Sequence, residues 1–242
     1  YKYIMGVNFD DDNLFRNEGI IMHMCLNEFL SFLKGRRIRS FEKADISSFI
    51  KNSLEIVFDG KTDLESRVIK SQIEKRLFEL YEFLKDRRGD DIVVETEKEG
   101  KMEVEVSKLR LRFRIVARSD VIFRNDRRID IADFKISDDA KDYLPKFKNI
   151  SEYKKVGSLQ LPLYIDVFSN YFDGVFNASV ILLGSRSITE EFLYKDDDYK
   201  YQKEFMGVVE NLLGDIYEKE FFEPPEDEKV CIKCPYRNLC FK

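Results

Sequence analysis

Two aspartates and a lysine in the middle of the chain have residue types and spacing suited to metal-dependent hydrolysis. Asp120 precedes a predicted hairpin, and Asp133 and Lys135 lie two residues apart on the strand after it. Residues two apart in a strand share a face, and the hairpin can bring Asp120 beside them. Converging carboxylates repel each other, and a hydrated divalent cation such as Mg²⁺ relieves this repulsion. A metal-activated water oriented by the Lys135 ammonium would then be a nucleophile for phosphodiester cleavage.

These patterns also have structural explanations. An Asp-x-Lys pair can be an ordinary salt bridge at a strand end. His23, the only histidine of the chain, could be a metal ligand or a hydrogen-bonded core residue on a largely apolar helix. Gln160 and Tyr164 are four residues apart and share one helix face, where they could serve the site or form a polar patch.

Three of the four cysteines, Cys231, Cys234 and Cys240, stand close to the end of the given sequence in the pattern C-x2-C-x5-C. No feature predicts export, so reduced thiols that bind a metal or cluster are expected rather than disulfides. Thiolates bind both iron–sulfur clusters and zinc, and the spacing of these cysteines does not distinguish between the two. Three cysteines leave a four-coordinate site one ligand short.

The composition predicts a soluble globular protein that can bury a substantial core. The chain has 242 residues, of which 43% are hydrophobic and 36% charged. No apolar run approaches the roughly 18 residues of a membrane helix, and no signal-peptide pattern is present, so a cytoplasmic location without membrane contact is expected. Because the net charge is −5, a nucleic-acid partner would have to be held by a local basic surface.

Hydrophobic periodicity predicts one mixed α/β domain whose mostly antiparallel sheet is flanked by helices. Helices are expected at residues 15–34, 45–57, 62–84, 157–172 and 199–221. Strands are expected at residues 108–118 and 178–184, and at 121–135 as a pair turning at Asn125-Asp126. Residues 92–106 are expected to form two short strands around a Glu-Gly turn.

A basic stripe follows the predicted strand at residues 108–118. The basic residues are at even positions and the apolar ones at odd positions: Lys108, Arg110, Arg112, Arg114 and Arg118 against Leu109, Leu111, Phe113, Ile115 and Ala117. Asp120 has the parity of the basic face, so the stripe could follow DNA phosphates toward the metal site. Alternatively, Glu103 and Glu105 neutralise the arginines across neighbouring strands.

Taken in order, these motifs resemble the RecB-like nucleases of the PD-(D/E)XK superfamily, closest to the C-terminal nuclease domain of AddB-type helicase–nuclease subunits. The resemblance covers nearly the whole chain. The matching positions are Gly19, His23 and Leu26 of G-x-x-x-H-x-x-L; Arg118 and Asp120 of G-R-x-D; Asp133-Phe134-Lys135 of D-Y-K; and Gln160 and Tyr164 of Q-x-x-x-Y. Ala117 replaces the family glycine, which matters only if the backbone there needs a positive φ.

The resemblance implies a restriction-endonuclease-like nuclease domain at residues 1–230, with residues 231–242 packing back on it. It assigns Mg²⁺ or Mn²⁺ ligation to His23, Asp120 and Asp133, with help from the Phe134 carbonyl. Lys135 would position the water. Gln160 and Tyr164 would orient the DNA phosphate or the site itself.

The cysteines match family members that carry a 4Fe-4S cluster. In those proteins the fourth cysteine lies upstream of the histidine helix, which corresponds to a position before Tyr1. The first residue is not Met, so the chain is expected to be a piece of a longer protein whose cluster is incomplete here, with a mobile tail. Cys25 is the alternative fourth ligand, although its apolar neighbours favour a buried structural thiol.

The resemblance therefore predicts a Mg²⁺- or Mn²⁺-dependent deoxyribonuclease, an exonuclease module for DNA repair or recombination. No Walker motif occurs, so a helicase motor would lie on another segment or subunit. The alternatives are a CRISPR-associated four-cysteine nuclease, a non-catalytic DNA-binding domain, and a regulatory domain stapled by a zinc site.

Overall fold

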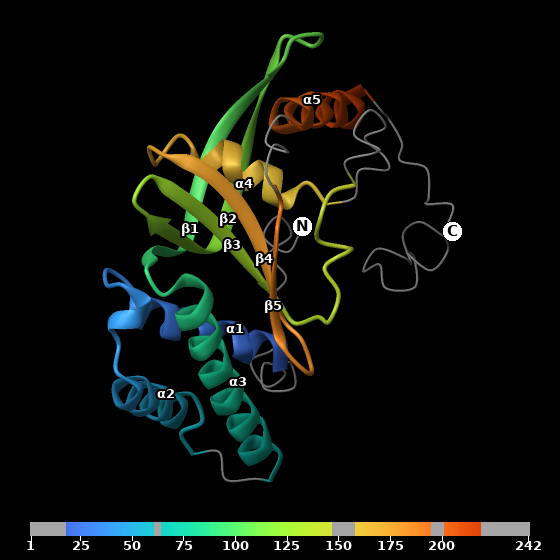
Figure 1. The fold of residues 1–242 in the computed structure, drawn as a ribbon. Helices are drawn as coiled ribbons and strands as arrows, with labels where there is room; N and C mark the ends of the chain where they lie inside the picture. The colour runs from blue at the N-terminus through green and yellow to red at the C-terminus, as the bar shows by residue number, and fades with distance from the viewer. Residues whose placement is uncertain (1–17, 61–63, 147–157, 195–200, 219–242) are drawn as a thin grey trace, which may run out of the picture.

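The computed structural model describes residues 18–60, 64–146, 158–194 and 201–218 (Figure 1). Its first part is helical: α1 (Glu18–Leu33), the short 3-10 helix η2 (Ile38–Ser40), α2 (Lys43–Val57) and α3 (Leu64–Arg88). The three long helices confirm the helices that hydrophobic periodicity predicted in this part of the chain. Helix α3 continues one turn beyond its predicted end, to the Gly89-Asp90 break.

A five-stranded sheet follows, in the order β1-β2-β3-β4-β5. Its strands are β1 (Ile92–Val106), β2 (Leu111–Asn125), β3 (Arg128–Lys135), β4 (Val175–Leu183) and β5 (Ile188–Phe192). Strands β3 and β4 are parallel and the other neighbours are antiparallel. The mixed, mostly antiparallel sheet flanked by helices is confirmed, as is the β2–β3 hairpin that turns after Asn125.

The two faces of the sheet are covered by different helices (Figure 1). Helices α1, α2 and α3 pack against one face, where β3 contributes Ala132 and Phe134 to their core. Helix α4 (Gln160–Phe168) packs on the other face, against Ile129 and Ile131. Helix α5 (Gln202–Glu218) lies beside the outer part of the β1–β2 hairpin. The alternation of β3 side chains thus separates the two cores.

The predicted turn inside residues 92–106 is wrong. Strand β1 runs through Gly100, which pairs with Ala117 of β2. A Cβ at position 100 would stand 2.6 Å from Val167 Cγ1 of α4, so this glycine allows the close approach of a helix. The reversal comes after Val106 instead, and Arg110 takes a φ of 53° there. Asp120 consequently lies inside the long strand β2 rather than at a strand end.

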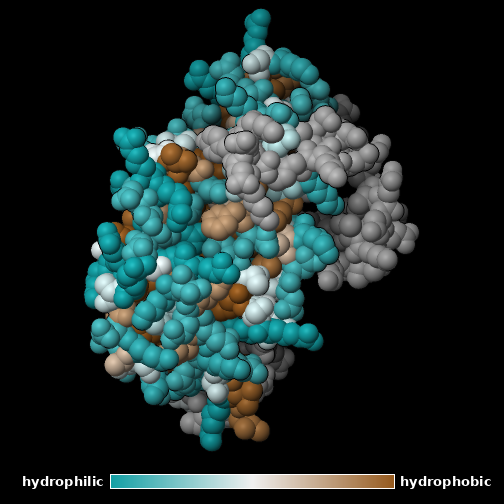
Figure 2. Space-filling view, in the orientation of Figure 1, coloured by the Kyte–Doolittle hydropathy of each residue, from teal (hydrophilic) through white to brown (hydrophobic). Residues whose placement is uncertain are grey.

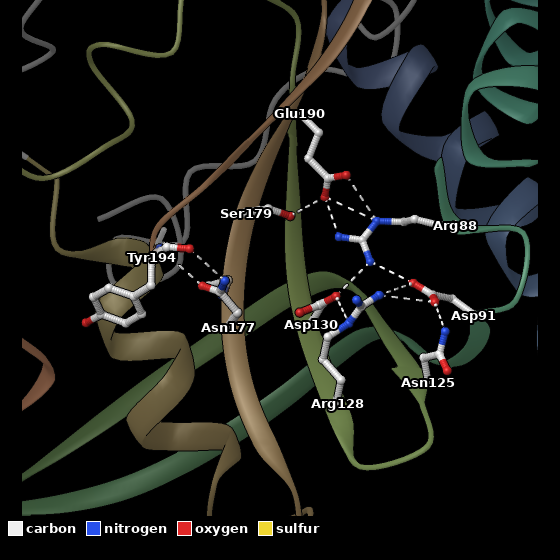
Figure 3. A network of polar contacts seen from close by, with 10 residues as sticks. Arg88, Asp91, Asn125, Arg128, Asp130, Asn177, Ser179, Glu190 and Tyr194 are labelled. Atoms are coloured by element: carbon white, nitrogen blue, oxygen red, sulfur yellow. Dashed lines mark hydrogen bonds and ion pairs between the residues drawn. The ribbon is translucent and has the colours of Figure 1, made fainter. Parts of the chain in front are cut away.

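Arg88, at the end of α3, anchors the helical layer to the sheet through a buried polar network (Figure 3). Its guanidinium donates to Asp91 Oδ2 at 2.9 Å and Asp130 Oδ2 at 3.0 Å, and it forms an ion pair with Glu190 of β5. The Arg128 Nε atom lies 2.9 Å from the same Asp130 oxygen. Burial alone would lower the pKa of Arg88, but Glu190 and Asp130 outweigh it and raise that pKa above its ordinary value.

The surface seen in Figure 2 is mostly hydrophilic, with apolar side chains in small separate groups. Within the described ranges, no helix has the length and apolar character required to cross a bilayer. Residues 231–242, which were expected to pack back on the domain, lie outside the described residues.

Candidate active site

Asp120 of β2 lies close to Asp133 and Lys135 of the neighbouring strand β3. Val121 pairs with Ala132, and Asp120 and Asp133 are the residues adjacent to this pair on their two strands. The Phe134 backbone N–H donates to Asp120 Oδ2 at 2.6 Å, which holds this carboxylate against β3. The Lys135 Nζ atom lies 2.5 Å from Asp133 Oδ2 as an ion pair. The predicted convergence of two carboxylates and one ammonium is therefore present.

Gln160 and Tyr164 of α4 hold the other oxygen of Asp133. Gln160 Nε2 and the Tyr164 hydroxyl lie 2.8 and 3.0 Å from Asp133 Oδ1, and Gln160 Nε2 lies 2.6 Å from the same hydroxyl. The Arg118 carbonyl is a second acceptor for this hydroxyl, at 2.8 Å. Because a phenol has one proton, it donates to one of the two acceptors at a time. Both residues thus orient Asp133, as their shared helix face suggested.

The charges of the two carboxylates repel each other. Burial and the charge of Asp133 raise the pKa of Asp120 to about 7, against a smaller lowering by the Phe134 N–H. Burial, and to a smaller extent the negative charge of Asp133, also raises the pKa of Tyr164. The Tyr164 hydroxyl therefore keeps its proton at neutral pH. The site therefore has an excess of negative charge, which among the described residues the Lys135 ammonium partly offsets.

The donor set fits a hard divalent cation. Asp133 Oδ2 is buried, and its close partner among the described residues is the Lys135 ammonium, at 2.5 Å. Carboxylate oxygens are the ligands that Mg²⁺ and Mn²⁺ prefer, and Mg²⁺ is commonly held by one or two carboxylates while it keeps several waters. Asp120 and Asp133 would hold such a cation, and among the described residues no third His, Cys, Asp or Glu side chain converges with them.

Comparison with known proteins gives the family. A sequence profile described as "PD-(D/E)XK nuclease superfamily" matches residues 1–241. The chain belongs to the PD-(D/E)XK nuclease superfamily. A search of curated proteins gives no significant match.

Two solved structures are similar to this PD-(D/E)XK chain in overall fold. The SSO0001 protein is 18% identical with a TM-score of 0.39, and the match covers 93% of this chain and 97% of that one. A Eubacterium rectale protein named "Putative exonuclease" is 12% identical with a TM-score of 0.46, and the match covers 96% and 85% of the two chains.

Two further residues that were predicted as possible ligands, His23 and Cys25, lie on α1. His23 is half-buried on α1 and belongs to no three-residue group of possible ligands among the described residues. Cys25 is 3% exposed within the helical core, and burial, with a smaller effect of Glu28, raises the pKa of its thiol to about 11. A thiol in these surroundings stays protonated, which suits a structural role. Cys231, Cys234 and Cys240 lie outside the described residues.

The basic stripe alternates as predicted within β2, but its arginines have acidic neighbours. Arg112 lies opposite Glu105, with Nε 3.6 Å from the carboxylate, and Arg114 lies opposite Glu103. The two predicted stripe residues nearest the turn, Lys108 and Arg110, lie in the turn itself rather than in a strand. Arg112 and its partner are well exposed, so their pairing is weak and leaves the arginine available to phosphates.

Two residues beside the PD-(D/E)XK site were not predicted. The Tyr143 ring centroid lies 5.6 Å from the Lys135 ammonium, which therefore has an aromatic face on one side. Glu97 of β1 has a φ of 49°, lies 2.5 Å from Arg118 Nε and raises the pKa of Asp120 by its charge. Neither stands in a motif: Tyr143 is in a polar loop and Glu97 in a charged strand, so only the fold brings them to the site.

Replacing Asp120 with asparagine is expected to stabilise the metal-free protein at pH 8, with a rise in Tm of about 2–4 °C. The amide removes one of two repelling carboxylates and still accepts the Phe134 N–H. In the wild type, Asp120 has a pKa of about 7 against an ordinary 3.8, so its contribution to stability is present below pH 4 and is lost as pH rises toward 7. Thermal unfolding in EDTA between pH 4 and 8 measures this difference.

The gain from asparagine should vanish near pH 4, where Asp120 is protonated in both folded and unfolded chains. With Mg²⁺ or Mn²⁺ the order should reverse, because the metal stabilises the wild type and the variant lacks a ligand. Lower stability of Asp120→Asn in EDTA at pH 8 would show that the carboxylates do not repel.

Proposed function

We propose that this chain is a metal-dependent deoxyribonuclease whose Asp120 and Asp133 hold Mg²⁺ or Mn²⁺. The observation that carries the proposal is the convergence of these two carboxylates with the Lys135 ammonium, which lies 2.5 Å from the buried Asp133 Oδ2. Membership of a nuclease superfamily agrees with this chemistry. His23 and the Phe134 carbonyl are proposed as additional ligands.

The residues of the site have separable tasks. A bound metal would neutralise the carboxylates, polarise the phosphate and supply a water of lowered pKa. Gln160 and Tyr164 form hydrogen bonds with Asp133 Oδ1 and so hold this side chain in one orientation. The position of the other carboxylate oxygen, Oδ2, is thereby fixed as well. Lys135, at the end of β3, holds a positive charge beside the same oxygen, where it can orient a water and stabilise charge on the phosphate.

The wider role we propose is that of an exonuclease module working with a helicase segment or subunit of the AddB type in DNA repair or recombination. The order of the motifs along the chain supports it. In the longer protein, Cys231, Cys234 and Cys240 would hold a 4Fe-4S cluster with a fourth cysteine upstream of Tyr1. A CRISPR-associated four-cysteine nuclease would use the same site.

The deciding experiment is incubation of the chain with linear duplex, linear single-stranded and closed circular DNA. Cleavage is expected with Mg²⁺ or Mn²⁺ and not with EDTA. Loss of linear DNA with survival of the circles would establish an exonuclease, and nicking of the circles would establish an endonuclease. A folded chain that cleaves none of these substrates with either metal would refute the proposed activity.

Reversing the charge of Arg112 and Arg114 together is expected to reduce the salt dependence of DNA binding. If both contact phosphates, the slope of log K against log salt should fall by about two. The measurement is fluorescence anisotropy with labelled duplex in EDTA. The matched control is the pair Lys51→Glu and Arg87→Glu, which makes the same charge change on the helical layer. Equal slopes for both double variants would exclude a role for the stripe.

A further inference from the structure

Five exposed arginines gather at the end of the sheet where β1 begins. They are Arg36, Arg37 and Arg39 between α1 and α2, and Arg124 and Arg127 at the end of β2 and in the turn after it. Two backbone pairings join these segments, because Arg37 forms a bridge with Ile92 and Ile92 pairs with Arg124. Figure 1 shows η2 beside this end of the sheet. We call these five residues the arginine surface.

The backbone holds the segment between α1 and α2 firmly against the start of β1. The Ile38 N–H donates to the Asp91 carbonyl at 3.1 Å, and the Arg39 N–H donates to the Gly89 carbonyl at 2.9 Å. The Ile38 side chain is fully buried in the helical core. A surface whose backbone is already ordered loses little conformational entropy when a ligand binds to it.

The arginine surface has more cations than nearby carboxylates. Asp90 lies 4.0 Å from Arg37 Nη1 and 2.7 Å from Arg39 Nη2, so one carboxylate serves two guanidinium groups. Asp126, exposed in the turn, adds a second carboxylate. The other three arginines of the surface form no ion pair with any residue that the structure describes. The surface is therefore positive although the net charge of the chain is −5.

Arg124 lies on the same strand as Asp120 and on the same side of it. Val121 and Phe123 belong to the helical core, whereas Ile122 belongs to the core that includes α4. Because side chains alternate along a strand, Asp120 and Arg124 both point away from the helical core. Four residues at about 3.3 Å each separate them by about 13 Å. This distance corresponds to about four base pairs of duplex DNA.

Arg37 also points away from the helical core. Its backbone is extended, with φ −64° and ψ 133°, and the next residue, Ile38, is buried in that core. The basic stripe residues Arg112 and Arg114 lie on the opposite side of Asp120 along β2. A DNA backbone that follows β2 would thus meet cations both before and after the candidate active site.

We propose that the arginine surface binds the phosphate backbone of DNA about four base pairs from the phosphate at which the chain cuts. Guanidinium groups bind phosphate oxygens through two parallel hydrogen bonds, and such contacts position DNA without reading its sequence. The inference rests on the proposed nuclease function and extends the path of its substrate beyond the carboxylates.

The test is the triple variant Arg37→Ala, Arg124→Ala and Arg127→Ala, whose side chains are exposed and whose loss should leave the fold intact. The matched control is Lys51→Ala, Lys75→Ala and Lys203→Ala, which removes three exposed charges from α2, α3 and α5. Fluorescence anisotropy with a labelled duplex in EDTA gives the slope of log K against log salt. The triple variant should lower this slope by about two to three, and the control should not.

Cleavage of the same duplex with Mg²⁺ gives a second measurement. The triple variant should raise KM about tenfold and change kcat less than about twofold, because the arginines lie far from the reacting phosphate. Circular dichroism and thermal unfolding of each variant check that the fold is retained. A fall in kcat with KM unchanged would contradict a role in binding.

An acidic segment of a partner protein is the competing occupant of the arginine surface. A labelled polyglutamate peptide is therefore titrated against the same variants. Peptide binding that the triple variant loses while its DNA slope stays at the wild-type value would overturn the assignment to DNA, as would equal slopes for the triple variant and its control. Absence of cleavage by the wild type would instead refute the nuclease function, and the slopes measured in EDTA would still decide the arginine surface.

Discussion

Lys135→Ala is expected to lower kcat for metal-dependent DNA cleavage by about 100- to 1,000-fold, the usual cost of removing one preorganised donor to a developing charge. The ammonium lies 2.5 Å from Asp133 Oδ2 and lowers the pKa of Asp120 by its charge. DNA affinity should change little, because the group acts on the reacting water and phosphate. Single-turnover cleavage of a labelled linear duplex measures the rate.

Two controls make this result specific. Lys101→Ala removes an exposed lysine whose ion pair with Glu99 is on the surface, and it should leave the rate unchanged. Lys135→Arg keeps the charge but replaces a compact ammonium with a planar guanidinium, so it should remain impaired. If Lys135→Ala retains more than a tenth of wild-type kcat, the proposed role of this lysine is wrong.

Arg88→Met is expected to destabilise the fold by about 3–5 kcal/mol, the typical cost of removing one partner from a buried ion pair. The guanidinium is 2% exposed and links α3 to Asp91, just before β1, to Asp130 of β3 and to Glu190 of β5 (Figure 3). The substitution leaves three carboxylates with Arg128 as the remaining cation of the network. Urea unfolding followed by circular dichroism at pH 7 measures the loss.

The neighbouring Arg87→Met is the matched control, because the Arg87 side chain is 70% exposed and its loss should cost less than about 0.5 kcal/mol. The deficit of Arg88→Met should shrink as pH falls toward 5. Burial already raises the pKa of Asp130 against the opposing charge of Arg88, and without Arg88 this pKa rises further, so protonation relieves the buried charge. A loss below 1 kcal/mol at pH 7 would show that the network does not anchor the layers.

The amino-acid sequence by itself determined the elements whose signals are local. Periodic apolar residues specified α1, α2 and α3, and the polar pair Asn125-Asp126 indicated the hairpin that brings Asp120 to Asp133, although the turn itself lies one residue later, at Asp126-Arg127. The two-residue spacing put Asp133 and Lys135 on one side of β3. Such features depend on residues within one helix turn or one hairpin, so a short window of sequence contains their physical cause.

Tertiary structure decided the rest. Gly100 looked like a turn because the crowding by Val167 comes from a helix more than sixty residues later. Strand β5 was missed because its short sequence ITEEF lacks an apolar alternation, and its pairing with β4 positions Glu190 for Arg88. The contacts of Gln160 and Tyr164 with Asp133, and of Tyr143 with Lys135, arise only when α4 and the loop after β3 pack on the sheet. Contacts between residues far apart in the chain depend on both partners at once, and no pattern around either residue alone encodes them.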